Sequence, residues 1–147
     1  LPNPMHRRGE TYKCVSYLSE KYNIPSKFKP LGQNQKFDHI EQFDFIKLWS
    51  PSIFHFNLDP AVEHPGHQTI QVANVGSINI GGKNESHFLL YPETATCDLD
   101  ILENKFVEYL NDVDKRFEVI SYAWENLNKY YSFEVVREQI KELYDKN

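Results

Sequence analysis

The clearest pattern along the chain is a series of large apolar side chains that recur every three or four residues between Leu99 and Tyr131. This spacing places side chains along one side of a helix. The members of the series are Leu99, Leu102, Phe106, Leu110, Val113, Phe117, Ile120, Trp124, Leu127 and Tyr131. The phase shifts at Asn111-Asp112, so the stretch is either one long helix or two helices that meet at Asn111.

Signals for helix termini surround this stretch. Thr96 or Asp98 can cap its beginning, and Ser132 can cap a final helix. The inner face of that final helix would consist of Phe133, Val136, Ile140 and Leu143. We therefore predict two or three helices over residues 97–146.

The middle of the chain, residues 43–91, has the alternating pattern of strands. Loops between its segments are short, and Gly81-Gly82-Lys83-Asn84 has the composition of a hairpin turn. Short loops favour antiparallel pairing, because parallel strands need long crossover connections. We expect five strands, at Phe43–Trp49, Ile53–Leu58, Gln68–Val75, Ser77–Ile80 and Ser86–Tyr91.

The beginning of the chain divides into an extended leader over residues 1–10 and a helix over 11–23 that Thr11 would cap. The fold prediction is a single α+β domain over 1–147. It has an N-terminal helix, a five-stranded antiparallel meander, and two to three C-terminal helices packed on one face of the sheet. Phe88, Phe117 and Trp124 are expected in the shared core.

Composition narrows the class of protein without naming a function. The chain of 147 residues carries a net charge of −5, yet residues 1–36 hold seven Lys or Arg and two Asp or Glu. This basic segment, which includes Arg7 and Arg8 of the leader, is the only place where we expect any contact with nucleic acid. The sequence contains neither a membrane span nor a signal peptide, and its two cysteines are too few for a disulfide scaffold, so we predict a cytoplasmic protein.

Strand alternation also predicts a candidate recognition surface. The face opposite the apolar one would carry amides, hydroxyls and imidazoles with no full charge, a composition that suits a ligand or a partner. Together with the turn Glu63–His67, this face gives the predicted binding residues His55, Asn57, Gln71, Asn79, His87 and His67.

A metal site is a weaker hypothesis. His64 and His67 lie near His55 and His87 in the predicted sheet, and histidine is a common ligand of zinc and iron. However, Pro65-Gly66 separates His64 from His67, so the pair cannot share a helix face, and we predict no metal and no cofactor.

We find no nucleophile motif and no phosphate-binding loop, which disfavours an enzyme without excluding one. The first hypothesis is a non-catalytic cytosolic binding protein, an inhibitor, immunity-type or adaptor factor that recognises a protein partner. The acidic stretch 93–118 would suit a basic partner. The alternatives are a small-ligand binding protein for a nucleotide or metabolite, and a metal-dependent enzyme at the His55, His64, His67 and His87 cluster.

Overall fold

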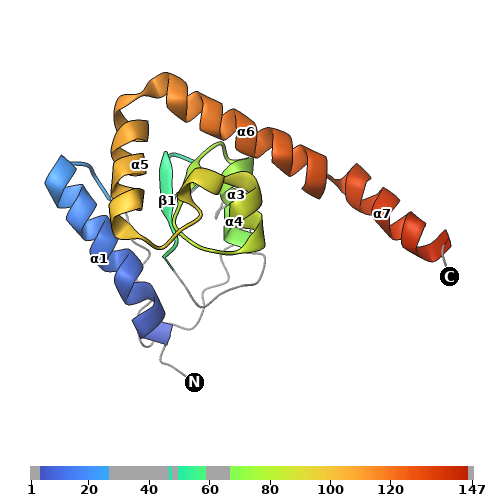
Figure 1. The fold of residues 1–147 in the computed structure, drawn as a ribbon, viewed down its shortest axis with the longest axis horizontal. Coiled ribbons are helices and arrows are strands. Elements are labelled where there is room, and N and C mark those ends of the chain that lie inside the picture. Colours follow the sequence, from blue (N-terminus) through green and yellow to red (C-terminus); the bar gives the residue numbers. More distant parts are fainter. Residues whose placement is uncertain (1–3, 27–46, 48–49, 59–66, 146–147) are drawn as a thin grey trace.

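A computed structural model describes residues 4–26, 47, 50–58 and 67–145 of the chain (Figure 1). The structure is mostly helical, with one small sheet. Its elements are α1 (Pro4–Tyr22), β1 (Phe54–Phe56), α3 (His67–Asn74), β2 (Ile78–Ile80), α4 (Glu85–Leu90), the 3-10 helix η1 (Pro92–Thr94), α5 (Leu99–Asn111), α6 (Val113–Tyr131) and α7 (Phe133–Asp145).

The two strands form a parallel pair, with His55 beside Asn79 in the register. The prediction of strands at these two places is confirmed, but the predicted five-stranded antiparallel meander is wrong. Helix α3 lies between β1 and β2 in the sequence and provides the crossover that parallel pairing needs. The strand expected at Phe43–Trp49 lies outside the described residues apart from Lys47.

The segment that forms α3 contains β-branched residues that alternate with polar ones, which is why it was predicted as a strand. Its buried residues are Thr69, Val72 and Ala73, a helical spacing that the alternation conceals. Gly76 ends the helix at a φ of 71°, and the amides of Gly76 and Ser77 bond back to the carbonyls of Ala73 and Val72. These paired bonds satisfy carbonyls that the helix end leaves open.

The segment predicted as the last strand is instead the short helix α4. Asn84 caps it, because its side-chain oxygen accepts a bond of 2.8 Å from the backbone N–H of His87. The buried residues Ser86, His87 and Leu90 share one helix face, and Phe88 points outward with 53% of its surface exposed. The core position predicted for Phe88 is therefore wrong.

Helices cover both faces of the sheet (Figure 1). Phe54 and Phe56 of β1 point to one face, where their rings lie 5.0 and 5.7 Å from the ring of Phe106 in α5. Asn79 points to the other face and contacts α3 and α4 through Thr69 and His87. The separation of aromatic and polar side chains along β1 and β2 therefore follows the strand alternation.

Helix α1 begins at Pro4, so the prediction of an extended leader is wrong for residues 4–10. The helix is joined to α5 through one carboxylate. Glu103 accepts hydrogen bonds of 2.6 Å from both Lys21 and Tyr22. Leu18, the one fully buried apolar residue of α1 among those described, adds packing to these polar contacts.

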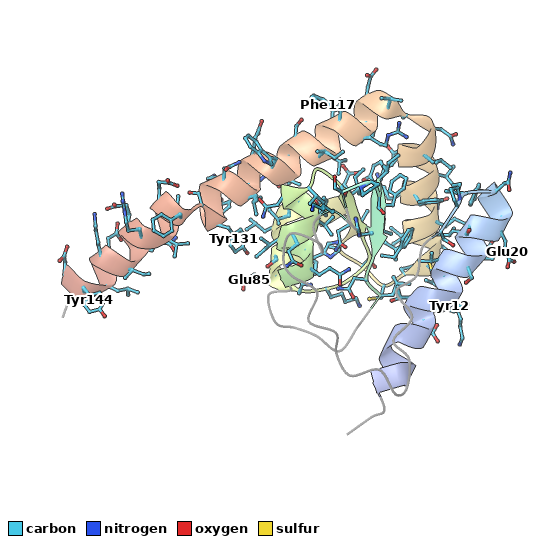
Figure 2. The ribbon with its side chains drawn as sticks, turned by 180° about the vertical axis from the view of Figure 1, so that it is seen from behind. Tyr12, Glu20, Glu85, Phe117, Tyr131 and Tyr144 are labelled. Atoms are coloured by element: carbon cyan, nitrogen blue, oxygen red, sulfur yellow. The ribbon has the colours of Figure 1, made fainter. Side chains whose placement is uncertain are left out.

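The C-terminal region forms three helices, and the question of one or two helices across Asn111 is answered by a break at Asp112. Asp112 is the N-cap of α6, and Asp98 is the N-cap of α5. Ala123 and Leu127 bury one side of α6 against the core. Phe117 lies on the outer side of α6 (Figure 2).

The prediction that the C-terminal helices all pack on one face of the sheet is wrong. Phe117 and Trp124 are 71% and 54% exposed, so their predicted core positions are wrong. The reason is that α6 crosses the end of the body and contacts it along one narrow side, while α7 continues away from the body (Figure 1).

Gly81 is the residue whose replacement should test the packing at the end of β2. Its φ is 89°, and an added Cβ would lie 2.4 Å from Leu58 Cδ2. We expect Gly81→Ala to lower the free energy of unfolding by at least about 3 kcal/mol, from backbone strain and overpacking.

Gly76→Ala is the matched control. Gly76 also has a positive φ, but nothing lies within 4 Å of an added Cβ, so only the backbone strain of about 1–2 kcal/mol applies. Urea denaturation followed by circular dichroism measures both variants. Equal losses would contradict the close packing of Gly81 on Leu58.

Candidate functional site

Two of the predicted binding residues, Asn79 and His87, form a closed ring of hydrogen bonds inside the protein. Asn79 Nδ2 donates to His87 Nδ1 over 2.8 Å, and His87 Nε2 lies 3.4 Å from Thr94 Oγ1. The Thr94 hydroxyl in turn donates to the backbone oxygen of Asn79 over 2.7 Å. The ring assigns the His87 proton to Nε2 and joins β2, α4 and η1.

The amide of Asn79 is not fully satisfied. Nδ2 also approaches Thr69 Oγ1 at 3.5 Å, whereas Oδ1 is buried and finds no hydrogen-bond partner among the described residues. Exchanging the oxygen and nitrogen of the amide would not remove the defect, because the nitrogen would then lie at the position that has no hydrogen-bond partner. Burial of an unsatisfied carbonyl costs stability, so the ring must compensate for this cost.

The other predicted residues are more scattered. Asn57 follows β1 and Gln71 lies in α3, both half-buried, while His55 faces the same side of the sheet as Asn79. His67 is the first residue of α3, but its side chain lies outside the described part of the chain, as does His64 entirely.

The structure therefore brings Asn79 and His87 together but buries them. A side chain with no exposed surface does not contact a partner in this conformation. A recognition role for the six residues stays a prediction from the sequence.

Groups that bind metals are dispersed over the described residues. No set of three or more His, Cys, Asp or Glu is close enough among them to hold a metal ion. Cys14 and Cys97 are free and half-buried, and burial raises the pKa of the Cys14 thiol, with the charge of Glu103 adding to the effect. A raised pKa keeps the thiol protonated and weakly nucleophilic.

A surface cleft of about 320 Å³ is a candidate binding site in the described part of the chain. It opens where η1, α5 and α6 meet. Its lining combines apolar, aromatic and charged side chains, chiefly Glu93, Tyr109, Lys115, Glu118, Val119 and Tyr122. Tyr109 is fully buried, whereas Tyr122 on the rim is 46% exposed.

The charges at the cleft form a chain of ion pairs. Glu93 pairs with Lys105 and, more loosely at 3.7 Å, with Lys115. Lys105 lowers the pKa of Glu93, and the pairing with Glu118 at 3.4 Å raises that of Lys115. The Glu93 carboxylate is therefore ionised at neutral pH, and the side chain of Glu118 is 68% exposed.

The helix junction that shapes the cleft is held by hydrogen bonds to the end of α5. Arg116 donates to the backbone oxygens of Tyr109 and Leu110 over 2.9 and 3.0 Å. Asp112 accepts a bond of 2.9 Å from the backbone N–H of Lys115. These contacts fix the direction of the first turns of α6, which carry Lys115 and Glu118.

Sequence reasoning did not identify this cleft as a site. The available signals were the acidic stretch 93–118 and the four-residue spacing of Glu118 and Tyr122, which places the two side chains on one side of a helix. The contribution of Glu93 could not be found in this way, because η1 was predicted as the loop after a strand.

Comparison with known proteins finds no matching family model, no matching curated protein and no matching solved structure. A helix long and apolar enough to cross a membrane is not found in the described segments. The site must therefore be interpreted from its own geometry.

Titration of His87 gives a test of the buried ring. Burial lowers the pKa of His87 from 6.5 to about 4, and the backbone carbonyl of Asn79, which favours the protonated ring, is a smaller opposing effect. Between these values the unfolded chain binds a proton that the folded chain does not, so acid favours unfolding. We expect the free energy of unfolding to fall by about 3 kcal/mol between about pH 7 and pH 4 from this residue.

The measurement is urea denaturation at several pH values for the wild type and for His87→Gln, which cannot titrate in this range. The carboxylates are the same in both proteins, so the difference between the two curves isolates His87. Parallel curves would show that the imidazole is not neutral and buried as described.

Proposed function

We propose that the chain is a non-catalytic, cytosolic binding protein that recognises a basic protein partner, as an inhibitor, immunity-type or adaptor factor does. The observation that carries the proposal is the cleft between η1, α5 and α6, where exposed carboxylate and tyrosine side chains adjoin a hollow of about 320 Å³. Tyrosines in partly desolvated hollows are frequent anchors of protein interfaces.

The cleft suits an arginine side chain of the partner. Glu118 and Tyr122 lie four residues apart on α6, so a guanidinium that pairs with the carboxylate can also stack on the ring. The existing pair of Glu118 with Lys115 is long at 3.4 Å and largely exposed. Such surface pairs contribute little, so a planar guanidinium can compete for the carboxylate.

The surrounding charge favours the same kind of partner. Residues 93–118 contain eight acidic and three basic side chains, so this one stretch has the same net charge of −5 as the whole chain. A concentrated negative field increases the rate of encounter with a basic surface.

A small-ligand binding protein is the second candidate. The cleft volume of about 320 Å³ lies at the lower end of the range that binds small molecules. Native mass spectrometry of the chain purified from its own cells distinguishes the candidates, because a bound small molecule appears as a fixed mass increment and a partner as a second chain.

The functional test is quantitative capture of partners from cells that make the chain, with wild type, Glu118→Lys and Tyr122→Ala as baits. We expect each substitution to reduce recovery of the specific partner at least about tenfold, as expected for a hot spot. Binding should also weaken as salt rises.

Glu142→Lys is the matched control, because it makes the same charge reversal on α7, away from the cleft. Recovery of the partner should be unchanged by this variant. Equal recovery by the wild type and both cleft variants would contradict the proposal.

A further inference from the structure

Helix α7 presents an exposed apolar face. None of its thirteen residues is buried, and its main packing neighbour is α6. The exposed fractions are 75% for Phe133, 49% for Ile140 and 64% for Leu143, and Val136 completes the series at 39%. An apolar stripe of this kind on a helix that leaves the body is typical of a helix that pairs with another.

The spacing of the stripe is that of a paired helix. Its steps are three, four and three residues, which is the repeat that keeps a seam facing a second helix. In this repeat, Ile140 occupies a position where β-branched residues favour two parallel strands. Leu143 occupies the other seam position, where leucine also favours two parallel strands.

The charges of α7 are arranged away from the stripe. At about 100° per residue, every carboxylate of the helix lies at least about 140° from the centre of the stripe. These carboxylates are Glu134, Glu138, Glu142 and Asp145. Two copies of α7 can therefore meet along the stripe while their negative charges stay on the outside.

We propose that α7 pairs in parallel with α7 of a second copy of this chain. The flanking residues decide the direction. Parallel pairing places Arg137 beside Ser132 of the other copy and Gln139 beside Tyr144, with no like charges in contact. Antiparallel pairing with the same seam would bring the two Arg137 side chains together, which opposes it.

This pairing is independent of the cleft and goes beyond the proposed function. A seam of about 20 Å, the length of thirteen helical residues, makes a small interface, so the dimer dissociates readily. The apolar stripe of α7 and the tyrosine-lined cleft lie on different elements, and variants of one leave the other intact.

The test is sedimentation equilibrium of the purified chain from about 10 to about 500 µM, where small interfaces dissociate. We expect the mass to rise from that of one chain, 17.4 kDa, toward that of two. Val136→Glu combined with Ile140→Glu should weaken dimerisation at least about tenfold, since charges enter the seam. Glu142→Lys, on the outer side, should leave it unchanged.

A cross-link tests the direction without weakening the seam centre. In a Cys14→Ser, Cys97→Ser background, Leu143→Cys should form a disulfide-linked dimer on mild oxidation. Antiparallel helices would hold these two residues about 15 Å apart, too far for a disulfide.

A wild-type chain that stays at the mass of one chain overturns the proposal, as does a dimer that survives the Val136 and Ile140 changes, a larger assembly, or a dimer without the Leu143 cross-link. Glu118→Lys should dimerise like the wild type. A failure of the dimerisation proposal can therefore be distinguished from a failure of the proposed partner binding at the cleft.

Discussion

The arrangement of the body depends on how one polar side chain, that of Asn79, is accommodated in the interior. Asn79 lies at the centre of β2 and has no exposed surface. A buried amide without partners is costly, and its partners come from two other elements: Thr69 of α3 and His87 of α4. Thr94 of η1 completes the arrangement by bonding to His87 and to the backbone oxygen of Asn79. Each of these contacts fixes the position of a helix relative to the strand, which an apolar residue could not do as specifically.

Close packing around Gly81 and Gly82 complements this polar ring. A side chain at Gly82 would meet His87 Nδ1 at 2.9 Å, and one at Gly81 would meet Leu58. The backbone amides of both glycines also bond to Thr94 and Thr96 over 3.1 Å. These contacts therefore fix the path of the backbone after β2. That path places His87 beside Asn79 and η1 at the rim of the cleft.

The sequence supports some of these features and conceals others. The helices after Asp98 follow from the long apolar series and its capping residues, because both signals are local. The position of Asn79 on the side of the sheet away from Phe54 and Phe56 also follows from strand alternation at β2. Helices α3 and α4 could not be inferred in the same way, since Thr69, Ile70 and Val72 are typical strand residues, and only tertiary packing decides their conformation.

The capping signals for α3 and α4 were nevertheless present in Gly76 and Asn84. They were outweighed by the glycine pair at 81–82, which is equally typical of a hairpin. The same error explains why the polar face was predicted to be exposed. When the residues of α3 and α4 are assigned to strands, no helix remains to cover that face of the sheet.

The outer edge of β2 has a consequence for how this protein behaves among other chains. In a two-stranded sheet each strand has a free edge, which is a template for intermolecular β-pairing. Here the carbonyls of Ser77 and Asn79 accept hydrogen bonds of 2.8 and 2.7 Å from the hydroxyls of Tyr91 and Thr94. Side chains thus occupy the places that a third strand would need, and an amyloid-like strand cannot add to β2 without first displacing both.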